Sequence, residues 1–419
     1  MKLLFLTDNF PPEVNAPATR TFEHCVEWVK AGVDVTVITC APNFPQGKLY
    51  PGFKNKLIQR ETIEGIKVIR VWTYIAENKG FLRRTLDYMS FMMSSFFAGL
   101  TIRADVIIAT SPQFFTVVSG FLLSFFKRTP WVMEVRDLWP ASILEVEAVK
   151  TKWMLFFFFW LEKRLYRSAD MIVPVTETFK MEIIKKGIDP SKIHVITNGS
   201  NLDLFSPRKP NLALKDELRL TDRFVVSYIG THGLAHCLEF VVQCAPELDR
   251  LNISLLFIGD GARKRVITEL VKSMNLKNVV LLNPAPKEQV PEYLSISDIS
   301  IIPLKKADIF TKVIPSKIFE SAAMEIPILL GVDGESRNLI EKYNAGLFFE
   351  PENKTDFLEK MQKFVQDKHF YEQCKLGGRK LASDYARKKL ARDFLARITE
   401  VDRAIALFSG EDTARAKEI

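Results

Sequence analysis

Short apolar runs alternate with longer amphipathic stretches along most of the chain. Runs of roughly four to seven residues, nearly all apolar, are typical of strands in a parallel sheet that is covered on both faces. In the first half these runs are residues 2–7, 33–39, 66–71, 106–110, 131–135, 171–175 and 193–197. In the second half they are residues 224–230, 253–259, 279–283, 299–304, 326–331 and 346–349. Helical spacing between the runs, as in residues 20–31, supplies the crossovers, so the pattern predicts two doubly wound α/β sheets.

The alternation restarts after residues 199–222, a segment rich in Pro, Asn, Asp and charge. A chain of 419 residues is also too long for one hydrophobic core. We therefore place a Rossmann-like domain at residues 1–200 and a second one at residues 201–388. Residues 389–407 carry a long amphipathic helical pattern with no strand after it.

The loops that follow the strands are the expected positions of site residues, because ligands bind beyond the carboxyl ends of strands in open α/β sheets. The polar, charged and glycine residues in these loops are Asn15, Arg20, Arg136, Asp137, Asn198, Gly230, Thr231, Gly233, Asp260, Gly261, Arg263 and Lys264. Glycines at such turns let backbone N–H groups approach an anion, although a glycine can equally serve the turn alone. Neither glycine pair belongs to a P-loop, because no GK[ST] follows.

The stretch KVIPSKIFESAAMEIPIL, residues 312–329, predicts a loop, a short helix and a strand. Pro315 suits the first helical turn, and Pro327 ends the helix. Ser316, Lys317 and Glu320 then share one side of the helix, whose first N–H groups attract phosphate oxygens. Glu320 is placed either to accept hydrogen bonds from ribose hydroxyls or to complement the helix dipole.

The charge and cysteine content restrict the partners and the compartment. The net charge is +8, and residues 1–200 hold 25 Lys and Arg against 19 Asp and Glu. A basic half suits nucleic acid, anionic lipid or a polyphosphate, but no zinc-finger or RRM pattern supports nucleic acid. The five cysteines are scattered, which predicts buried thiols in a reducing compartment. His232 and His236 are four residues apart without a third ligand nearby, so no metal is expected.

Three strongly apolar stretches occupy residues 88–102, 106–126 and 153–161. Ser111-Pro112 interrupts the middle one, which predicts a buried strand followed by an apolar helix. Basic residues flank the stretches: Arg83, Arg84, Lys127, Arg128, Lys150, Lys152, Lys163 and Arg164. Core helices with solvated ends and a membrane face that lies in the lipid interface both fit this pattern. A helix that spans the bilayer fits it less well.

The order of several sequence pieces resembles glycosyltransferase family four, whose members are retaining enzymes of the GT-B fold. The pieces are NFPPEVNAPATR, VRDLWP, EKRLYRSADMIVPVTE, VITNGSNLDLFSP, IGDGARK and PSKIFESAAMEIPIL. RDLWP and PSKIFE are most similar to bacterial enzymes that extend lipid-linked O-antigen or capsule precursors, including N-acetyl-fucosamine transferases. The resemblance implies two facing Rossmann-like domains, with a C-terminal helix, residues 389–419, that packs back on the first domain.

The resemblance also implies roles for individual residues. Glu320 would hold the ribose, and the loop from Gly230 to Gly233 would lie under the phosphates. The remaining nucleotide-sugar contacts would come from Ser316, Lys317, Ile318, Thr231, Asp260, Gly261, Arg263, Lys264 and Asn198. Arg136, Asp137 and Lys312 would act at the reaction centre, and Asn15 and Arg20 on the acceptor side.

This chain departs from the family pattern at several positions. Lys312 stands where the family has the first of two glutamates, Arg136 stands where many relatives have a histidine, and Asn15-Ala16-Pro17 replaces a glycine pair. The loss of an acceptor at Lys312 leaves the donor sugar open, and an acetamido-deoxyhexose fits.

The implied function is the metal-independent transfer of a hexosyl group from a nucleotide sugar, UDP-linked by expectation, to a lipid-linked saccharide in cell-surface polysaccharide synthesis. No cofactor beyond the nucleotide-sugar co-substrate is expected. The enzyme would lie on the cytoplasmic side, peripherally attached to an anionic membrane. Two alternatives share the fold: an epimerase that acts on UDP-N-acetylglucosamine, and a non-catalytic scaffold subunit, which Lys312 would fit.

Overall fold

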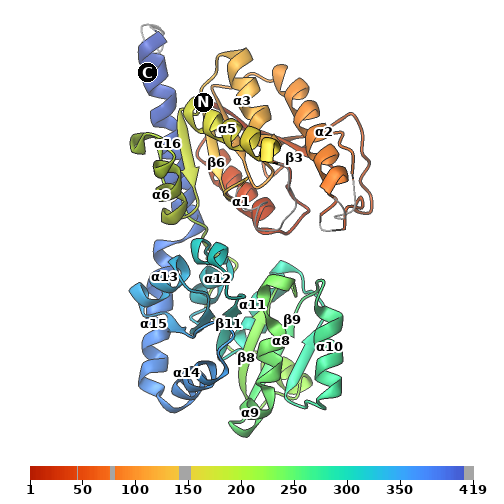
Figure 1. Cartoon of the computed structure of the whole chain (residues 1–419), viewed down its shortest axis with the longest axis vertical. Coiled ribbons are helices and arrows are strands. Elements are labelled where there is room, and N and C mark those ends of the chain that lie inside the picture. The colour runs from red at the N-terminus through yellow and green to blue at the C-terminus, as the bar shows by residue number, and fades with distance from the viewer. Residues whose placement is uncertain (45, 76–80, 141–151, 410–419) are drawn as a thin grey trace. The chain divides into compact units, whose positions relative to one another are not determined.

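The computed structural model describes residues 1–44, 46–75, 81–140 and 152–409, and the chain forms two units (Figure 1). Unit 1 consists of Met1–Thr197 together with the chain from Lys388 onward. Unit 2 consists of Asn198–Arg387. Lys150, one of the predicted flanking cations, lies outside the described residues.

Unit 1 is built on a seven-stranded sheet with the order β3-β4-β2-β1-β5-β6-β7. Among the described strands, β3 alone runs antiparallel to its neighbour. The strands are β1 Lys2–Leu6, β2 Asp34–Cys40, β3 Ile58–Ile63, β4 Ile66–Val71, β5 Val106–Thr110, β6 Trp131–Val135 and β7 Met171–Pro174. The helices are α1 Ala16–Lys30, α2 Phe81–Leu100, α3 Phe114–Lys127, α5 Lys152–Ser168, α6 Glu177–Lys185 and α16 Arg387–Ser409.

Unit 2 is built on a six-stranded parallel sheet with the order β10-β9-β8-β11-β12-β13. Its strands are β8 Phe224–Ile229, β9 Ile253–Ile258, β10 Val279–Leu282, β11 Ile299–Pro303, β12 Ile328–Gly331 and β13 Gly346–Phe348. Its α-helices are α7 Leu212–Glu217, α8 Leu238–Gln243, α9 Ala245–Arg250, α10 Lys264–Ser273, α11 Val290–Ser295, α12 Lys317–Ala323, α13 Glu335–Tyr343, α14 Lys354–Gln366 and α15 Lys368–Asp384. Four short 3₁₀ turns are described in the chain: η1 Pro190–Lys192, η2 Leu234–His236, η3 Lys287–Gln289 and η4 Asp308–Lys312.

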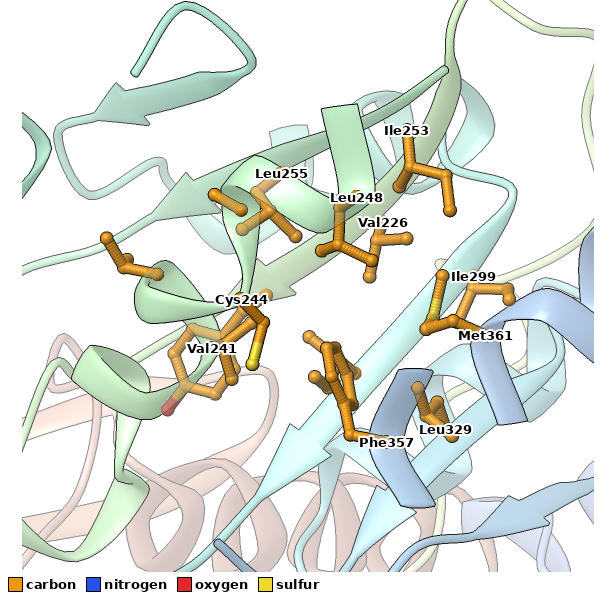
Figure 2. Close-up of a cluster of buried hydrophobic side chains, with 14 of the residues drawn as sticks. Val226, Val241, Cys244, Leu248, Ile253, Leu255, Ile299, Leu329, Phe357 and Met361 are labelled. Carbon is orange, nitrogen blue, oxygen red and sulfur yellow. The ribbon is translucent and has the colours of Figure 1, made fainter. Parts of the chain in front are cut away.

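The core of unit 2 lies between its central strands and the helices that cover them. Figure 2 shows Val226, Leu255 and Ile299 of the sheet together with Leu248 of α9 and Phe357 of α14, all of them fully buried. The near-continuous apolar runs give the sheet apolar side chains on both faces, and a sheet of this kind needs helices to cover both. The predicted fold class, two doubly wound parallel α/β sheets, is confirmed.

Helix α16, from the far end of the chain, completes the core of unit 1. Leu390, Phe394 and Ile398 belong to the same buried cluster as the strands β1, β2 and β5. The Trp28 indole N–H donates to the Ala391 carbonyl at 2.8 Å, and the Trp28 and Phe394 rings pack edge to face at 5.3 Å. The amphipathic pattern of residues 389–407 is therefore the pattern of a helix that buries one side.

Two strand predictions are wrong. The run 193–197 makes only an isolated bridge, Ile193 to Ile172, and β3 is a strand that the apolar pattern missed. The N–H groups of His194 and Ile196 donate to carbonyls of β7, whereas the carbonyls of Ile196 and Thr197 accept from the side chain of Arg20, so the run lies beside β7 without a regular ladder. In β3 the residues alternate between exposed and half-buried, and an antiparallel edge strand needs no continuous apolar run.

The predicted helix that opens at Pro315 is shorter than expected. Helix α12 begins at Lys317 and ends at Ala323, with Ser316 as its N-cap residue and Met324 as its C-cap residue. Pro315 and Pro327 therefore lie outside the helix rather than at its ends.

Arg20 and Glu134 form an ion pair in the core of unit 1, with side chains that are 0% and 1% exposed. The Arg20→Ala variant should lose about 3–5 kcal/mol of stability, because a buried carboxylate is left without its counter-charge. The urea midpoint of the full-length chain measures this loss. Arg265→Ala, which breaks a pair that is 87% and 65% exposed, is the matched control and should change stability by about 0.5 kcal/mol or less. A midpoint for Arg20→Ala equal to that of the control would contradict the prediction.

Candidate functional site

Three loops meet at the carboxyl edge of the unit 2 sheet. They follow β8, β9 and β11, and β8 lies between the other two strands. Most of the predicted nucleotide-site residues lie in these loops or in the first turns of α10 and α12. The unit 2 sheet therefore brings these predicted residues together at one edge, as the rule for open α/β sheets requires.

The loops after β8 and β9 interlock through glycines. Gly230, Gly259 and Gly261 have φ angles of +142°, +151° and +154°, which only glycine adopts readily. A Cβ on Gly259 would lie 1.9 Å from the Gly230 carbonyl oxygen, and one on Gly261 would lie 2.5 Å from the His232 carbonyl oxygen. These glycines allow close packing of the two loops, which is a role that the sequence left open.

Backbone hydrogen bonds join the same two loops. The His232 N–H donates to the Asp260 carbonyl at 2.8 Å, and the Arg263 N–H donates to the His232 carbonyl at 2.9 Å. Within the described part of the chain, the N–H groups of Thr231 and Gly233 donate no hydrogen bond. Thr231 is exposed, so this loop reaches the surface, where backbone N–H groups without a partner can bind an anion.

Lys317 of α12 lies directly against the β8 loop. Its Nζ is 5.1 Å from the centre of the Tyr228 ring, and it is 2.7 Å from the position that a Cβ on Gly230 would take. Burial lowers the pKa of Lys317, an effect that the carboxylate of Glu320 opposes. Gly230 is thus required for this lysine to reach the edge of the sheet.

The two cations at the start of α10 are held by neighbouring groups. Arg263 pairs with Glu239 of α8, and the Lys264 ammonium donates to the Leu282 carbonyl at 2.6 Å. Burial lowers the pKa of Lys264, and Asp260 opposes this effect. Both cations lie beside the interlocked loops, but their contacts show that Arg263 serves the packing of α10 on α8.

The start of α12 differs from the sequence expectation. The N–H groups of Ile318 and Phe319 donate to the carbonyls of Pro315 and Ser316, so they do not offer free donors to a phosphate. The Ile318 side chain is fully buried in a hydrophobic cluster. The side chain of Ile318 is therefore part of the core, and the contact predicted between Ile318 and the nucleotide sugar stays a prediction.

Lys312 and Glu320 lie on either side of this turn. Lys312 is the last residue of η4, and it is half-buried. Glu320 is half-buried on α12. A cavity of about 440 Å³ lies nearby and is lined by Lys305, Lys306, Ala307, Asp308, Phe310, Thr311, Val332, Asp333, Arg337, Phe348, Glu350 and Pro351. Neither Lys312 nor Glu320 lines this cavity.

The predicted residues of unit 1 divide into two groups. Arg136 and Asp137 follow β6, and both of their N–H groups donate to the Ser111 hydroxyl, at 2.7 and 3.3 Å. They are half-buried at the carboxyl edge of the sheet. Asn15 and Arg20 instead have structural contacts. Asn15 caps α1 through the Ala18 N–H, and Arg20 is fully buried.

The buried Arg20–Glu134 pair interacts electrostatically with Arg136. Burial alone would raise the pKa of Glu134, but the guanidiniums of Arg20 and Arg136 hold it below its ordinary value. Arg20 therefore keeps the Glu134 carboxylate charged, and because it is fully buried it does not itself present a surface to an acceptor.

Asn198 is half-buried and is the first residue of unit 2.

Two carboxyl groups of unit 1 were not singled out from the sequence. Asp8 lies two residues after the end of β1, and Asp87 lies on α2. Burial, with the neighbouring Asp87 and Glu13, raises the pKa of Asp8 to about 8. Burial raises the pKa of Asp87 to about 7, against the opposing effect of Arg84. The position of Asp8 at the end of a strand was the available sequence signal, but its coupling to α2 is a tertiary property.

Comparison with known proteins gives matches in both units. The chain matches the family "Glycosyl transferase 4-like domain" over residues 15–199 and "Glycosyl transferases group 1" over residues 213–381.

Two curated relatives illustrate the similarity. The putative colanic acid biosynthesis glycosyl transferase WcaI of Escherichia coli (strain K12) is 25% identical over 332 residues, which cover 76% of this chain and 80% of the relative. N-acetylgalactosamine-N,N'-diacetylbacillosaminyl-diphospho-undecaprenol 4-alpha-N-acetylgalactosaminyltransferase of Campylobacter jejuni is 23% identical over 239 residues, which cover 55% of this chain and 60% of the relative.

Two solved structures share the fold. Sucrose-phosphate synthase from Thermosynechococcus elongatus superposes with a TM-score of 0.78 at 15% identity, covering 96% of this chain and 99% of that one. Anabaena HepE in complex with UDP-glucose superposes with a TM-score of 0.71 at 14% identity, covering 96% of this chain and 100% of that one.

The raised pKa of Asp8 predicts a pH-dependent stability. The folded chain keeps this carboxyl protonated up to about pH 8, whereas the unfolded chain ionises it near 3.8. Stability from this group is therefore fully present below pH 3.8 and is lost as the pH rises through 8. Asp8→Asn should melt at a higher temperature than the wild type at about pH 8.5, with a smaller difference at about pH 5. A difference between the two melting temperatures that does not change with pH would exclude the raised pKa.

Proposed function

Because this chain is a glycosyltransferase of the GT-B fold, we propose that it transfers a sugar from a nucleoside-diphosphate donor, UDP-linked, to a lipid-linked saccharide. The product would be a precursor of a cell-surface polysaccharide of the O-antigen or capsule type. Three relatives support the proposal. WcaI is named for colanic acid biosynthesis, the Campylobacter enzyme for an undecaprenol-linked saccharide, and HepE was solved with UDP-glucose.

One observation carries the donor site: the Lys317 ammonium lies over Gly230 at the edge where the β8 and β9 loops interlock. An ammonium with lowered hydration beside exposed backbone N–H groups suits the charge of a diphosphate. Lys264 adds a second positive charge at the same edge. Glu320, three residues after Lys317, would accept hydrogen bonds from the ribose hydroxyls.

The reaction would proceed by electrostatic stabilisation of the leaving group. As the bond between the anomeric carbon and the diphosphate oxygen breaks, negative charge collects on the diphosphate and positive charge on the sugar ring. Lys317 and Lys264 would stabilise the former without reorganisation, which is the usual source of large rate effects. The acceptor oxygen forms the new bond to the anomeric carbon on the face that the diphosphate leaves, and its proton passes to the diphosphate.

In this scheme the configuration is retained and no protein nucleophile is needed. The lysines that bind the diphosphate take the place of a metal ion. These three points are proposals that follow from the resemblance. Arg136 and Asp137 of unit 1, fixed by the Ser111 hydroxyl, would contact the sugar or the acceptor. Lys312 would take the place of the carboxylate that contacts the donor sugar. The loss of this hydrogen-bond acceptor fits an acetamido-deoxyhexose.

An apolar face of unit 1 supports a membrane-bound acceptor. We define this apolar face by the exposed side chains Leu86, Met89, Met93 and Phe97 of α2, Phe125 and Phe126 of α3, and Trp153, Phe156, Phe157 and Trp160 of α5. Helix α3 packs against both α2 and α5, and the ring pairs Phe96–Phe126 and Phe115–Phe158 connect the three helices. Every helix within the described ranges is too short or too polar to traverse a bilayer.

Positive charge accompanies the apolar face. Arg83 and Arg84 are exposed at the start of α2, Arg128 at the end of α3, and Lys163 and Arg164 on α5. Aromatic side chains beside exposed cations are the composition that binds the interface of an anionic bilayer. We place the enzyme peripherally on the cytoplasmic leaflet, where a lipid-linked acceptor would be within reach.

The ribose role of Glu320 predicts a loss of nucleotide affinity. Glu320→Gln should weaken UDP binding by about 1–3 kcal/mol, because a charged acceptor of ribose hydroxyls becomes neutral. Isothermal titration calorimetry with UDP measures the change. Glu359→Gln, at an exposed position on α14, is the control and should bind UDP like the wild type. Unchanged affinity in Glu320→Gln would remove Glu320 from the nucleotide site.

The apolar face predicts binding to anionic vesicles. The wild type should sediment with phosphatidylglycerol-containing vesicles, and Trp153→Ser/Phe156→Ser should largely stay in the supernatant. These side chains are 71% and 75% exposed, so the variant should keep its melting temperature. Leu376→Ser, at a 59% exposed position of unit 2, is the control. A wild type that never sediments with these vesicles would end the membrane proposal.

A further inference from the structure

Two histidines at the edge of the unit 2 sheet, the buried His232 and the half-buried His236, hold buried ring nitrogens that have no hydrogen-bond partner. His232, in the loop after β8, is fully buried, and neither of its ring nitrogens has a hydrogen-bond partner in the described chain. His236, at the end of η2, buries its Nδ1 without a bonded partner, 3.2 Å from where a Cβ on Gly233 would lie. Buried polar atoms are nearly always paired in folded proteins, so two such rings in one place require an explanation.

Both rings converge on the same aromatic side chain as Lys317. The ring centres of His232 and His236 lie 5.9 and 5.8 Å from that of Tyr228, and the Lys317 Nζ lies over the same ring. The Tyr228 hydroxyl donates to the Thr231 carbonyl at 2.7 Å, which ties the ring to the β8 loop. Two imidazoles and one ammonium are thus gathered where the diphosphate would bind.

The charged groups around the two rings come from several elements. Lys317 and Glu320 lie on α12, Lys264 begins α10, and Asp260 lies in the loop after β9. Arg263 and Glu239 neutralise each other as a pair between α10 and α8. Of these groups, Lys264 and Lys317 act on His232 against Asp260, and Lys317 acts on His236, so the charges that act on the two rings are mainly positive.

Burial and the nearby lysines favour the neutral form of both imidazoles. Burial, Lys264 and Lys317 lower the pKa of His232 to about 4, with Asp260 acting in the opposite direction. Burial and Lys317 lower the pKa of His236 to about 4, against the effect of the Gly233 backbone. A diphosphate anion would add negative charge beside the rings, and an opposite charge favours the protonated ring.

We propose that His232 and His236 are positioning residues of the donor site, and that at least one of them takes up a proton when the diphosphate of the nucleotide sugar binds beside Lys317. This inference rests on the proposed function. The imidazolium would donate to a phosphate oxygen or hold the Thr231–Gly233 backbone against it, and it would discharge its proton when the nucleotide leaves. In the neutral ring one nitrogen is an acceptor, and it becomes a donor to the anion only when the ring takes up the proton.

Proton uptake has a direct thermodynamic signature. If one proton is taken up near pH 7, donor affinity falls about tenfold for each unit that the pH rises, and partial uptake gives a smaller slope. Nucleotide sugars are suitable probes because their diphosphate is a diester with no ionisation near neutral pH. UDP itself is unsuitable, because its terminal phosphate titrates in this range.

The experiment is calorimetry of the full-length protein with UDP-glucose, UDP-N-acetylglucosamine and GDP-mannose, followed by the tightest of them in buffers of different ionisation heat. The wild type should take up between about half and one proton at pH 7. His236→Gln should reduce this number and flatten the dependence of affinity on pH between about 6 and 8. His369→Gln, on the exposed side of α15, should behave like the wild type.

The two histidines can also be observed directly, since the chain holds five histidines in all. In spectra of histidine-labelled protein at neutral pH, His232 and His236 should be neutral when free, and at least one should become an imidazolium with the probe bound. A purely structural role would leave both rings neutral in the complex.

The outcomes separate the two proposals. Binding of a nucleotide sugar with no proton uptake and two neutral rings would overturn this inference and leave the proposed function intact. Binding of none of the three probes would count against the proposed function and the inference together.

Discussion

The close contact between the loops after β8 and β9 is the constraint on which the unit 2 site depends. The absent side chain of Gly259 leaves room for the Gly230 carbonyl, and the absent side chain of Gly261 leaves room for the carbonyl of His232. Any larger residue would force the loops apart by more than a van der Waals contact allows. This contact also positions the turn at Gly230. The Lys317 side chain can pack against that turn only because Gly230 lacks a Cβ. The position of the Lys317 ammonium thus depends on three glycines, Gly230, Gly259 and Gly261.

Arg20 of unit 1 and Lys317 of unit 2 are cations in different surroundings. In unit 1 each guanidinium nitrogen of the fully buried Arg20 donates a hydrogen bond, to Glu134 or to one of two carbonyls, so this side chain stabilises the fold and is not exposed to a ligand. In unit 2 Lys317 rests on the face of an aromatic ring, and two histidines nearby keep unsatisfied nitrogens. A fully paired charge is evidence for structure, whereas polar atoms left unsatisfied in a protein interior often mark a place where a ligand completes the set.

The sequence predicted the fold more completely than the site. All six strands of unit 2 were found from apolar runs, because strands covered on both faces have the simplest pattern. The run 193–197 lies beside β7 without forming a regular strand, and its carbonyls at Ile196 and Thr197 accept from Arg20, a partner more than 170 residues away. Ile318 was assigned to the substrate by its place in a motif, but the direction of its side chain is set by packing, and its N–H is used by Pro315. Helix α5 gives the same lesson, since Phe156 is exposed and Phe158 buried within one apolar run.

The order of the chain also couples the two units during folding. Unit 2 is continuous from Asn198 to Arg387, so it can fold as soon as it has been synthesised. Unit 1 cannot close its core at that point, because Trp28 and the strands of its sheet pack against Phe394 and Ile398 of α16. The last helix therefore protects the apolar side of α1, whose exposure would otherwise favour aggregation. Helix α16 covers this apolar side of α1, whereas the apolar face on α2, α3 and α5 stays exposed.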